Sequence, residues 1–115
     1  MNKKIVKVGY GDVEKIKIGG QNPLVFVGGP CAIENRDHAL FMAASIKKIC
    51  DKLKIQWIYK SCYDKDCRSS PKSFHGVGIE KGLEILSEVR RLYKVPVVSD
   101  FSDPSWADLT CLLYT

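Results

Sequence analysis

The chain has 115 residues, a formal net charge of +5 and a hydrophobic share of 45%. This length permits one domain at most, and the apolar content with interleaved charges excludes a disordered or low-complexity protein. The positive charges are spread along the chain without a basic block or a known nucleic-acid motif, so we expect no nucleic-acid partner.

The N-terminal region shows neither a secretion signal nor an apolar run long enough to cross a membrane. Residues 5–8 read Ile-Val-Lys-Val, and their alternation interrupts the apolar segment that a signal peptide needs. The five cysteines are an odd number, and disulfides rarely persist in the cytoplasm. The sequence therefore predicts a cytoplasmic protein with reduced thiols and no membrane partner.

The first predicted elements form a small hairpin and a strand. Residues 3–8 and 13–18 alternate polar and apolar side chains around residues 9–12, Gly-Tyr-Gly-Asp, which favour a turn. Residues 24–27 then form an uninterrupted apolar run, which is typical of a strand covered on both faces.

Helices and strands alternate over the rest of the chain. Apolar residues recur at helical spacing over 36–53 and 79–93, and apolar runs at 55–59 and 95–98 predict strands. After the last strand, Asp103 is placed to cap a helix whose first position holds a proline. This order predicts an α/β fold with right-handed crossovers, in which the C-terminal ends of parallel strands meet at one edge.

Two segments with reactive or charged side chains follow the first two predicted strands of this sheet. The sequence GGPCAIE at 28–34 provides the thiol of Cys31, and KSCYDKDCRSS at 60–70 provides cations and hydroxyls. Lysine offers a compact positive charge, arginine can grip phosphate oxygens with two N–H groups, and serine can donate a hydrogen bond. Because these segments converge at one edge, they predict a site for a phosphorylated, carboxylated substrate.

Each of these residues also has an ordinary alternative role. Lysines and arginines in loops are usually solvated, and a lone cysteine such as Cys31 is more often a buried small apolar residue than a metal ligand. Asp100, which follows the third strand, could equally accept hydrogen bonds from nearby backbone groups.

Several short motifs can be compared with known families: GGPCAIE at 28–34, YKS at 59–61, DK at 64–65, RSS at 68–70 and GVG at 76–78. Together they resemble the 3-deoxy-8-phosphooctulonate synthase (KDO-8-phosphate synthase) family, within the superfamily that also holds the DAHP synthases. The resemblance runs roughly from residue 5 to residue 104. Its most specific part is the stretch from Lys60 to Ser70. The motif GGPCAIE is less specific, because DAHP synthases carry similar sequences.

The resemblance implies the N-terminal portion of a (β/α)8 TIM barrel, preceded by a β-hairpin. Such a barrel takes about 250 residues, so residues 1–115 would be a single incomplete, truncated domain. Its parts would be a hairpin at about 3–18 and strand–helix units at about 24–53, 55–93 and 95–115. Members of the family form homotetramers, so a homo-oligomer is expected.

The family condenses phosphoenolpyruvate with D-arabinose 5-phosphate to give KDO 8-phosphate and phosphate, for lipopolysaccharide synthesis. The resemblance implies that Lys60 and Lys65, the expected catalytic residues, hold the phosphate and carboxylate of phosphoenolpyruvate. It also implies that Arg68 and Ser69 bind the pentose phosphate, while Asp100 is a further candidate contact. Fixed cations would offset the repulsion between two anionic substrates and orient their reacting carbons.

Cys31 matches the cysteine of metal-dependent family members, so the resemblance implies a divalent ion (Zn, Fe or Mn) whose other ligands come from later strands. Two positions depart from the family pattern and weaken the pentose assignment: Cys67 replaces an asparagine, and Phe101-Ser102 replaces Val-His. The alternatives are a DAHP synthase-like aldol transferase, which the context of Arg68 disfavours, and an inactive barrel fragment that pairs with other chains.

Overall fold

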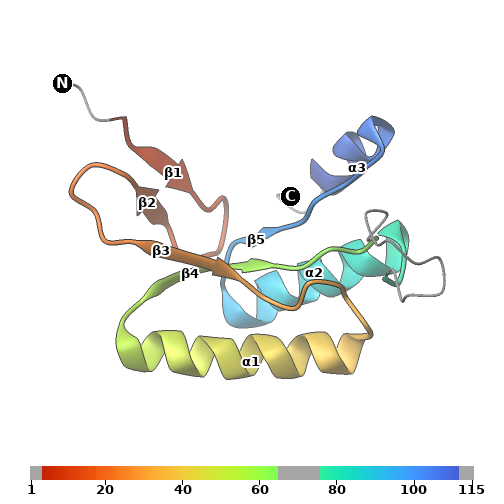
Figure 1. Cartoon of the computed structure of the whole chain (residues 1–115), viewed down its shortest axis with the longest axis horizontal. Coiled ribbons are helices and arrows are strands. Elements are labelled where there is room, and N and C mark those ends of the chain that lie inside the picture. The colour runs from red at the N-terminus through yellow and green to blue at the C-terminus, as the bar shows by residue number, and fades with distance from the viewer. Residues whose placement is uncertain (1–3, 65–75, 112–115) are drawn as a thin grey trace.

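The computed structural model describes residues 4–64 and 76–111 and shows a mixed α/β fold (Figure 1). Its elements in chain order are β1 (Val6–Val8), β2 (Ile16–Ile18), β3 (Val25–Gly28), α1 (Arg36–Leu53), β4 (Gln56–Lys60), α2 (Ile79–Tyr93), β5 (Val97–Val98), the 3-10 turn η1 (Pro104–Trp106) and α3 (Ala107–Cys111). β1 and β2 pair antiparallel, while β3, β4 and β5 form a parallel sheet with β4 in the centre. The predicted order of elements is confirmed.

The hairpin pairs Val6 with Ile18 and Val8 with Ile16, as the alternation of polar and apolar residues predicted. Its strands are shorter than the predicted segments, and the connecting loop is longer. Ile16 is 1% exposed, so the hairpin contributes to the buried interior.

Both long helices have the predicted bounds. The side chain of Asn35 caps α1 by accepting a hydrogen bond from the His38 backbone N–H at 2.8 Å, and Lys54 ends the helix in the left-handed conformation. Cys50 and Leu53 both belong to the apolar repeat that predicted this helix. Cys50 packs in the core at 5% exposed, whereas Leu53 lies in the last turn and is 59% exposed.

The core lies between one face of the parallel sheet and these two helices. Trp57 and Tyr59 of β4 point to this face, because alternate residues of a strand share a side, and they are 3% and 0% exposed. The helices add small or branched side chains to the same core: Ala39, Ala43 and Cys50 from α1, and Ile85, Leu86 and Val89 from α2. Both helices therefore cover the same side of the sheet.

The prediction that the first parallel strand is covered on both faces is wrong. Leu24 precedes the strand and is 95% exposed, while Phe26 and Val27 are 46% and 47% exposed. Within the described residues β3 pairs only with β4 and therefore forms an edge of the sheet. An apolar run identifies a strand, but its burial depends on neighbours that the run itself does not specify.

The third strand is shorter than predicted, and Pro96 explains why. Proline has no backbone N–H to donate to a neighbouring strand. Its carbonyl still accepts a hydrogen bond from the Tyr59 N–H at 2.9 Å, but regular pairing is limited to Val97 and Val98. Among the described residues, none of the helices combines the length and the apolar character that crossing a membrane requires.

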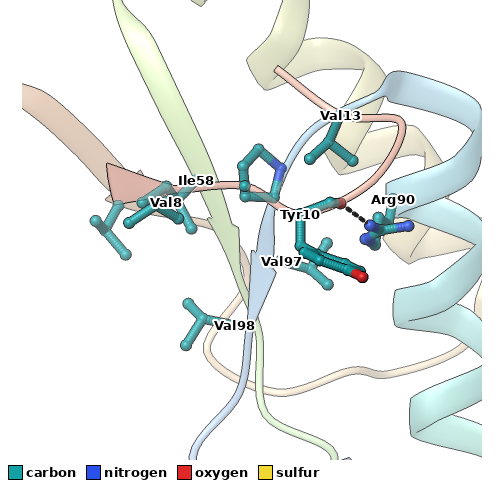
Figure 2. A pocket seen from close by; sticks show the side chains of 10 residues that line it. Val8, Tyr10, Val13, Ile58, Arg90, Val97 and Val98 are labelled. Atoms are coloured by element: carbon teal, nitrogen blue, oxygen red, sulfur yellow. Dashed lines mark hydrogen bonds between the residues drawn. The ribbon is translucent and has the colours of Figure 1, made fainter. Parts of the chain in front are cut away.

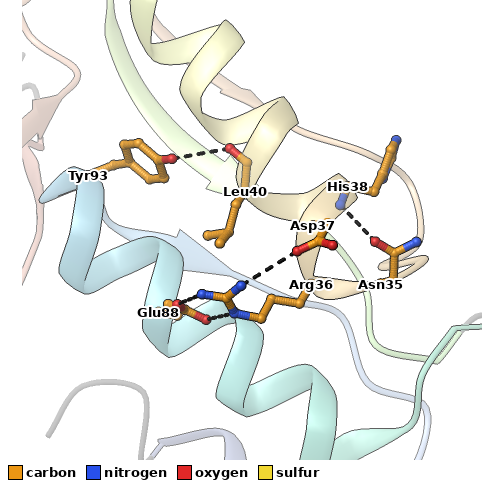
Figure 3. Close-up of polar contacts among 7 residues, drawn as sticks. All are labelled: Asn35, Arg36, Asp37, His38, Leu40, Glu88 and Tyr93. Carbon is orange, nitrogen blue, oxygen red and sulfur yellow. Dashed lines mark hydrogen bonds and ion pairs between the residues drawn. The ribbon is translucent and has the colours of Figure 1, made fainter.

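Two polar contacts join α1 to α2 (Figure 3). The Arg36 guanidinium donates two hydrogen bonds to the Glu88 carboxylate, at 2.8 and 2.5 Å, and the Tyr93 hydroxyl donates to the Leu40 carbonyl at 3.2 Å. The hydrogen bonds from Arg36 lower the pKa of Glu88, and the same carboxylate raises the pKa of Arg36. Polar groups therefore hold α2 to the first two turns of α1.

This lowered pKa predicts a specific pH dependence of stability. Because the pKa of Glu88 is lower in the folded state than in the unfolded chain, its contribution is present at neutral pH and is lost on acidification. Glu88→Gln should therefore lower the free energy of unfolding at neutral pH, and its difference from the parent should be smaller at about pH 3. Urea titrations at both pH values measure this.

The matched control for that experiment is Glu84→Gln, which changes an exposed acid of the same helix. We expect its effect on the free energy of unfolding to be small at both pH values. A pH profile that is the same for Glu88→Gln and Glu84→Gln would contradict a stabilising role for the contact with Arg36.

Candidate functional site

The segments that follow the three parallel strands are held together by hydrogen bonds that continue beyond the strands. The Cys62 N–H donates to the Cys31 carbonyl at 3.2 Å, and the Ile33 N–H donates to the Cys62 carbonyl at 2.9 Å. On the other side of β4, the Ser61 N–H donates to the Val98 carbonyl at 3.2 Å. The predicted convergence of these strand ends is confirmed.

Side chains reinforce this edge of the sheet. The buried Ser61 hydroxyl donates to the Pro30 carbonyl at 2.6 Å, and the Trp57 indole N–H donates to the Gly28 carbonyl at 2.9 Å. Gly29 lies so close to β4 that a Cβ there would be 2.2 Å from the Lys60 carbonyl oxygen. Gly29, the second glycine of GGPCAIE, is therefore needed for the close approach of two backbones. The hydrogen bonds of Ser61 and Trp57 were not predicted from the sequence.

Lys60 and Asp100 form an ion pair at this edge. The Lys60 ammonium is 3.4 Å from an Asp100 carboxylate oxygen, and the side chains are 48% and 47% exposed. Lys60 also lines an open cavity of about 210 Å³ together with Gly29, Pro30 and Cys31. The structure thus brings together three of the predicted site residues, Cys31, Lys60 and Asp100. An exposed ion pair of this kind is weak, so a bound anion can compete with the carboxylate for the ammonium.

The other predicted site residues, Lys65, Arg68 and Ser69, lie outside the described residues, and their roles stay predictions. The ends of the segment that contains them are nevertheless close together. The Gly78 N–H donates to the Tyr63 carbonyl at 3.0 Å, so the two described residues that flank this segment are held together beside the end of β4.

Tyr63 connects this place to the segment after β5. Its side chain is 0% exposed, its hydroxyl forms a 3.1 Å hydrogen bond with the Thr110 hydroxyl, and its ring centre is 5.9 Å from that of Trp106. Burial raises the pKa of the Tyr63 hydroxyl, so the group stays protonated. This role could not be predicted from the sequence, because the partners are far apart along the chain and share no local pattern.

Gly82 permits the contact between Tyr63 and α2. A Cβ at Gly82 would be 2.1 Å from the Cβ of Tyr63. Gly82→Ala should therefore lower the free energy of unfolding by about 1–2 kcal/mol, because overpacking outweighs the gain in helix propensity. Urea unfolding followed by circular dichroism measures this. Ser87→Ala, at an exposed position of α2, is the control and should have little effect; a stabilised Gly82→Ala variant would contradict the prediction.

The described residues do not form a metal site by themselves. Within 4–64 and 76–111, no group of three His, Cys, Asp or Glu side chains is arranged to hold a metal ion. Cys31 is an exposed free thiol, whereas the buried Cys62 thiol is 3.0 Å from the Asp64 carbonyl. Since one thiolate alone does not hold a divalent ion, the implied metal does not fit this part of the chain without further donors.

A second cavity, of about 310 Å³, lies between the hairpin and the sheet face that carries no helix (Figure 2). The Arg90 guanidinium donates a hydrogen bond to the Tyr10 carbonyl, and the Glu14 N–H donates to the Lys94 carbonyl at 2.9 Å, so the hairpin loop is held to the end of α2. Most of the wall is apolar: Val8, Val13, Val27, Ile58, Pro96, Val97 and Val98. Arg90 also lines the cavity, but its guanidinium donates to the Tyr10 carbonyl, so this mostly apolar cavity is a weaker candidate for a phosphate site than the strand ends.

Parallel strands joined by helices, with charged side chains at their C-terminal ends, define an α/β protein whose candidate ligand site lies at that edge. Residues 3–112 match the model of the DAHP synthetase I family. The chain belongs to this family.

Curated relatives give a narrower comparison. The 2-dehydro-3-deoxyphosphooctonate aldolase of Rickettsia rickettsii (strain Sheila Smith) is 48% identical over 107 residues, which is 93% of this chain and 37% of the relative. The protein of the same name from Rickettsia conorii (strain Malish 7) is 49% identical over 102 residues, 89% of this chain and 35% of the relative. That name denotes KDO-8-phosphate synthase, so the resemblance predicted from the motifs is confirmed. The chain spans only 37% and 35% of the length of these two relatives.

Proposed function

We propose that the chain is the N-terminal part of a KDO-8-phosphate synthase, which condenses phosphoenolpyruvate with D-arabinose 5-phosphate. The observation that carries the proposal is the meeting of Lys60, Cys31 and Asp100 at the strand ends, in a chain 48% identical to relatives named for this activity. The match to the DAHP synthetase I family alone would fit either arabinose 5-phosphate or erythrose 4-phosphate as the sugar acceptor.

The proposed architecture is a single incomplete (β/α)8 barrel domain over residues 1–115. It is supported by the parallel order β3-β4-β5 and by helices on one side of the sheet. The face without helices carries Val27, Ile58 and Val98, as expected for strands that face a barrel interior. In this proposal the cavity of Figure 2 belongs to that interior, and the site lies at the C-terminal ends of the strands.

The proposed chemistry needs cations more than a nucleophilic side chain. Carbon 3 of phosphoenolpyruvate bonds to the aldehyde carbon of the pentose, water adds to carbon 2, and inorganic phosphate leaves as its C–O bond breaks. Lys60 and Lys65 would hold the phosphate and carboxylate of phosphoenolpyruvate, and Arg68 and Ser69 the phosphate of the pentose. Asp100 would contact the sugar or set the position of the Lys60 ammonium, 3.4 Å away.

Cys31 is proposed as one donor to a divalent ion, Zn, Fe or Mn, completed by donors outside the described residues. Its exposure at the wall of the cavity that Lys60 lines supports this assignment. We also propose that the complete protein is a cytoplasmic homo-oligomer, as the family resemblance implies.

The test is release of inorganic phosphate from phosphoenolpyruvate with each sugar phosphate in turn. Release that requires arabinose 5-phosphate and is abolished by a chelator supports the proposal, whereas a preference for erythrose 4-phosphate supports a DAHP synthase. Lys60→Met is the matched inactive variant. A folded chain without activity on either sugar supports an inactive fragment, the alternative favoured by the exposed apolar sheet face.

A further inference from the structure

The pairing between β3 and β4 changes register at the candidate site. Within the two strands the last pair is Gly28 with Tyr59, and beyond them the next bridge joins Ala32 to Cys62. The three residues 29–31 of one segment therefore lie opposite the two residues 60–61 of the other. One extra residue on one strand of a pair is the defining feature of a β-bulge. Residues 29–31 are here named the site bulge.

The site bulge decides which face of the sheet each following side chain reaches. Regular pairing would set Cys31 opposite Cys62, whose side chain is 2% exposed. The extra residue puts Ala32 in that place, and Cys31 stays exposed at the wall of the cavity at the strand ends. Because side chains alternate, the same shift turns Ile33 toward the helices, where it packs in the core at 1% exposed. The site bulge thus keeps the Cys31 thiol accessible while the core stays filled.

A buried side chain of β4 holds the site bulge in place. Proline suits a bulge, because it has no backbone N–H to leave unpaired. Its carbonyl still needs a donor, and the Ser61 hydroxyl donates to the Pro30 carbonyl at 2.6 Å. Ser61 is 1% exposed, so removing its hydroxyl would leave a carbonyl without this donor in a place that bulk water does not reach.

We propose that Ser61 is a positioning residue, whose hydroxyl holds the site bulge in the shape that exposes the Cys31 thiol to the cavity lined by Lys60. Ser61 lies on the same side of β4 as Tyr59 and faces the helices, so it acts on the cavity only through the bulge. Its importance for catalysis rests on the proposed function, in which Cys31 donates to a metal ion and Lys60 binds phosphoenolpyruvate. The geometry does not depend on that function and can be tested without a substrate.

Chemical crosslinking measures whether Cys31 and Lys60 face the same cavity. A short reagent with a maleimide for the thiol and a succinimidyl ester for the amine can join them. In the whole chain, Cys67 and Cys111 are first replaced by serine, since the remaining thiols of Cys50 and Cys62 are buried. The parent should form the crosslink between Cys31 and Lys60, and peptide mass spectrometry gives its yield.

Ser61→Thr and Ser61→Val form the decisive pair, because the two new side chains have nearly the same shape and differ in the hydroxyl. Ser61→Thr should keep the crosslink yield of the parent. Ser61→Val should lower it several-fold, because the Pro30 carbonyl loses its donor and the site bulge changes shape. Ser61→Ala should behave like Ser61→Val, which separates loss of the hydroxyl from any difficulty in fitting a larger side chain. Circular dichroism shows whether each variant is folded.

Two control variants test whether the effect is specific to Ser61. The Tyr59 hydroxyl is also buried and lies near that of Ser61, but it completes no hydrogen bond within the described residues. Tyr59→Phe should therefore leave the crosslink yield unchanged. Glu88→Gln, which is expected to lower stability at the contact between the helices, should leave the yield unchanged as well.

The outcomes separate this inference from the proposed function. Equal crosslink yields for Ser61→Thr and Ser61→Val, or a parent that forms no crosslink between Cys31 and Lys60, would overturn the inference. Lys60 belongs to the regular part of β4 and pairs with Val98, so Ser61→Val should bind inorganic phosphate as tightly as the parent does. A parent that binds no phosphate would count against the proposed function and would leave the crosslinking result unaffected.

Discussion

Replacing Gly29 with alanine is expected to lower the free energy of unfolding by about 3 kcal/mol, a large part of the stability of a domain this small. The added Cβ would lie 2.2 Å from the Lys60 carbonyl oxygen, which belongs to the backbone of β4 and cannot rotate away. The ends of β3 and β4 would have to separate, which lengthens the hydrogen bond from Ser61 to Pro30. Urea unfolding followed by circular dichroism and tryptophan fluorescence measures the loss.

Gly28→Ala is the control for this substitution. A Cβ at Gly28 would meet the ring of Phe26 at 2.3 Å, but that side chain is 46% exposed and can turn toward solvent. We therefore expect a loss below about 1 kcal/mol. If the two neighbouring glycines tolerate alanine equally well, the close contact between Gly29 and β4 does not limit stability.

Anion binding at the strand ends should depend on Lys60 and be opposed by Asp100. Lys60→Met is expected to weaken the binding of inorganic phosphate and phosphoenolpyruvate about tenfold, because it removes a charge-assisted hydrogen bond. Asp100→Asn should strengthen the binding of phosphate several-fold, because the Lys60 ammonium, 3.4 Å from that carboxylate, then loses this acidic competitor. Both effects should shrink at high salt. Titrations of the isotope-labelled chain monitored by NMR give the affinities.

Lys17→Met, which changes an exposed lysine of β2, is the control for net charge. It should leave phosphate binding nearly unchanged, and an equal loss in Lys17→Met and Lys60→Met would show that only overall charge matters. Asp100→Asn also separates the two roles open to Asp100. If its carboxylate contacts the sugar, the variant gains affinity for phosphate but loses affinity for arabinose 5-phosphate; if it only positions Lys60, it gains affinity for both.

The bounds of α1 and α2 could be predicted from the sequence because each helix repeats its apolar spacing over several turns. The strands were less predictable. The prediction for residues 24–27 failed on burial, since Leu24 and Val27 have few neighbours in the described part of the fold. The third strand was predicted too long because Pro96 continues the apolar run but cannot donate a backbone hydrogen bond.

Part of the candidate site could be predicted for a geometric reason. Parallel strands end at one edge, so the proximity of Cys31, Lys60 and Asp100 follows once the order of elements is known. The contacts of Tyr63 with Gly82 and Thr110 could not be predicted. A glycine inside a helix and a tyrosine in a loop carry no sign that they touch, and only the fold brings them together.

The hydrogen bond from the Gly78 N–H to the Tyr63 carbonyl anchors the two described residues on either side of a long stretch of sequence. When the ends of a stretch are held together in this way, doubling its length costs only about 0.6 kcal/mol of additional closure entropy. Changes in the number or identity of the residues between these anchors are therefore expected to leave the packing of the described sheet and helices intact.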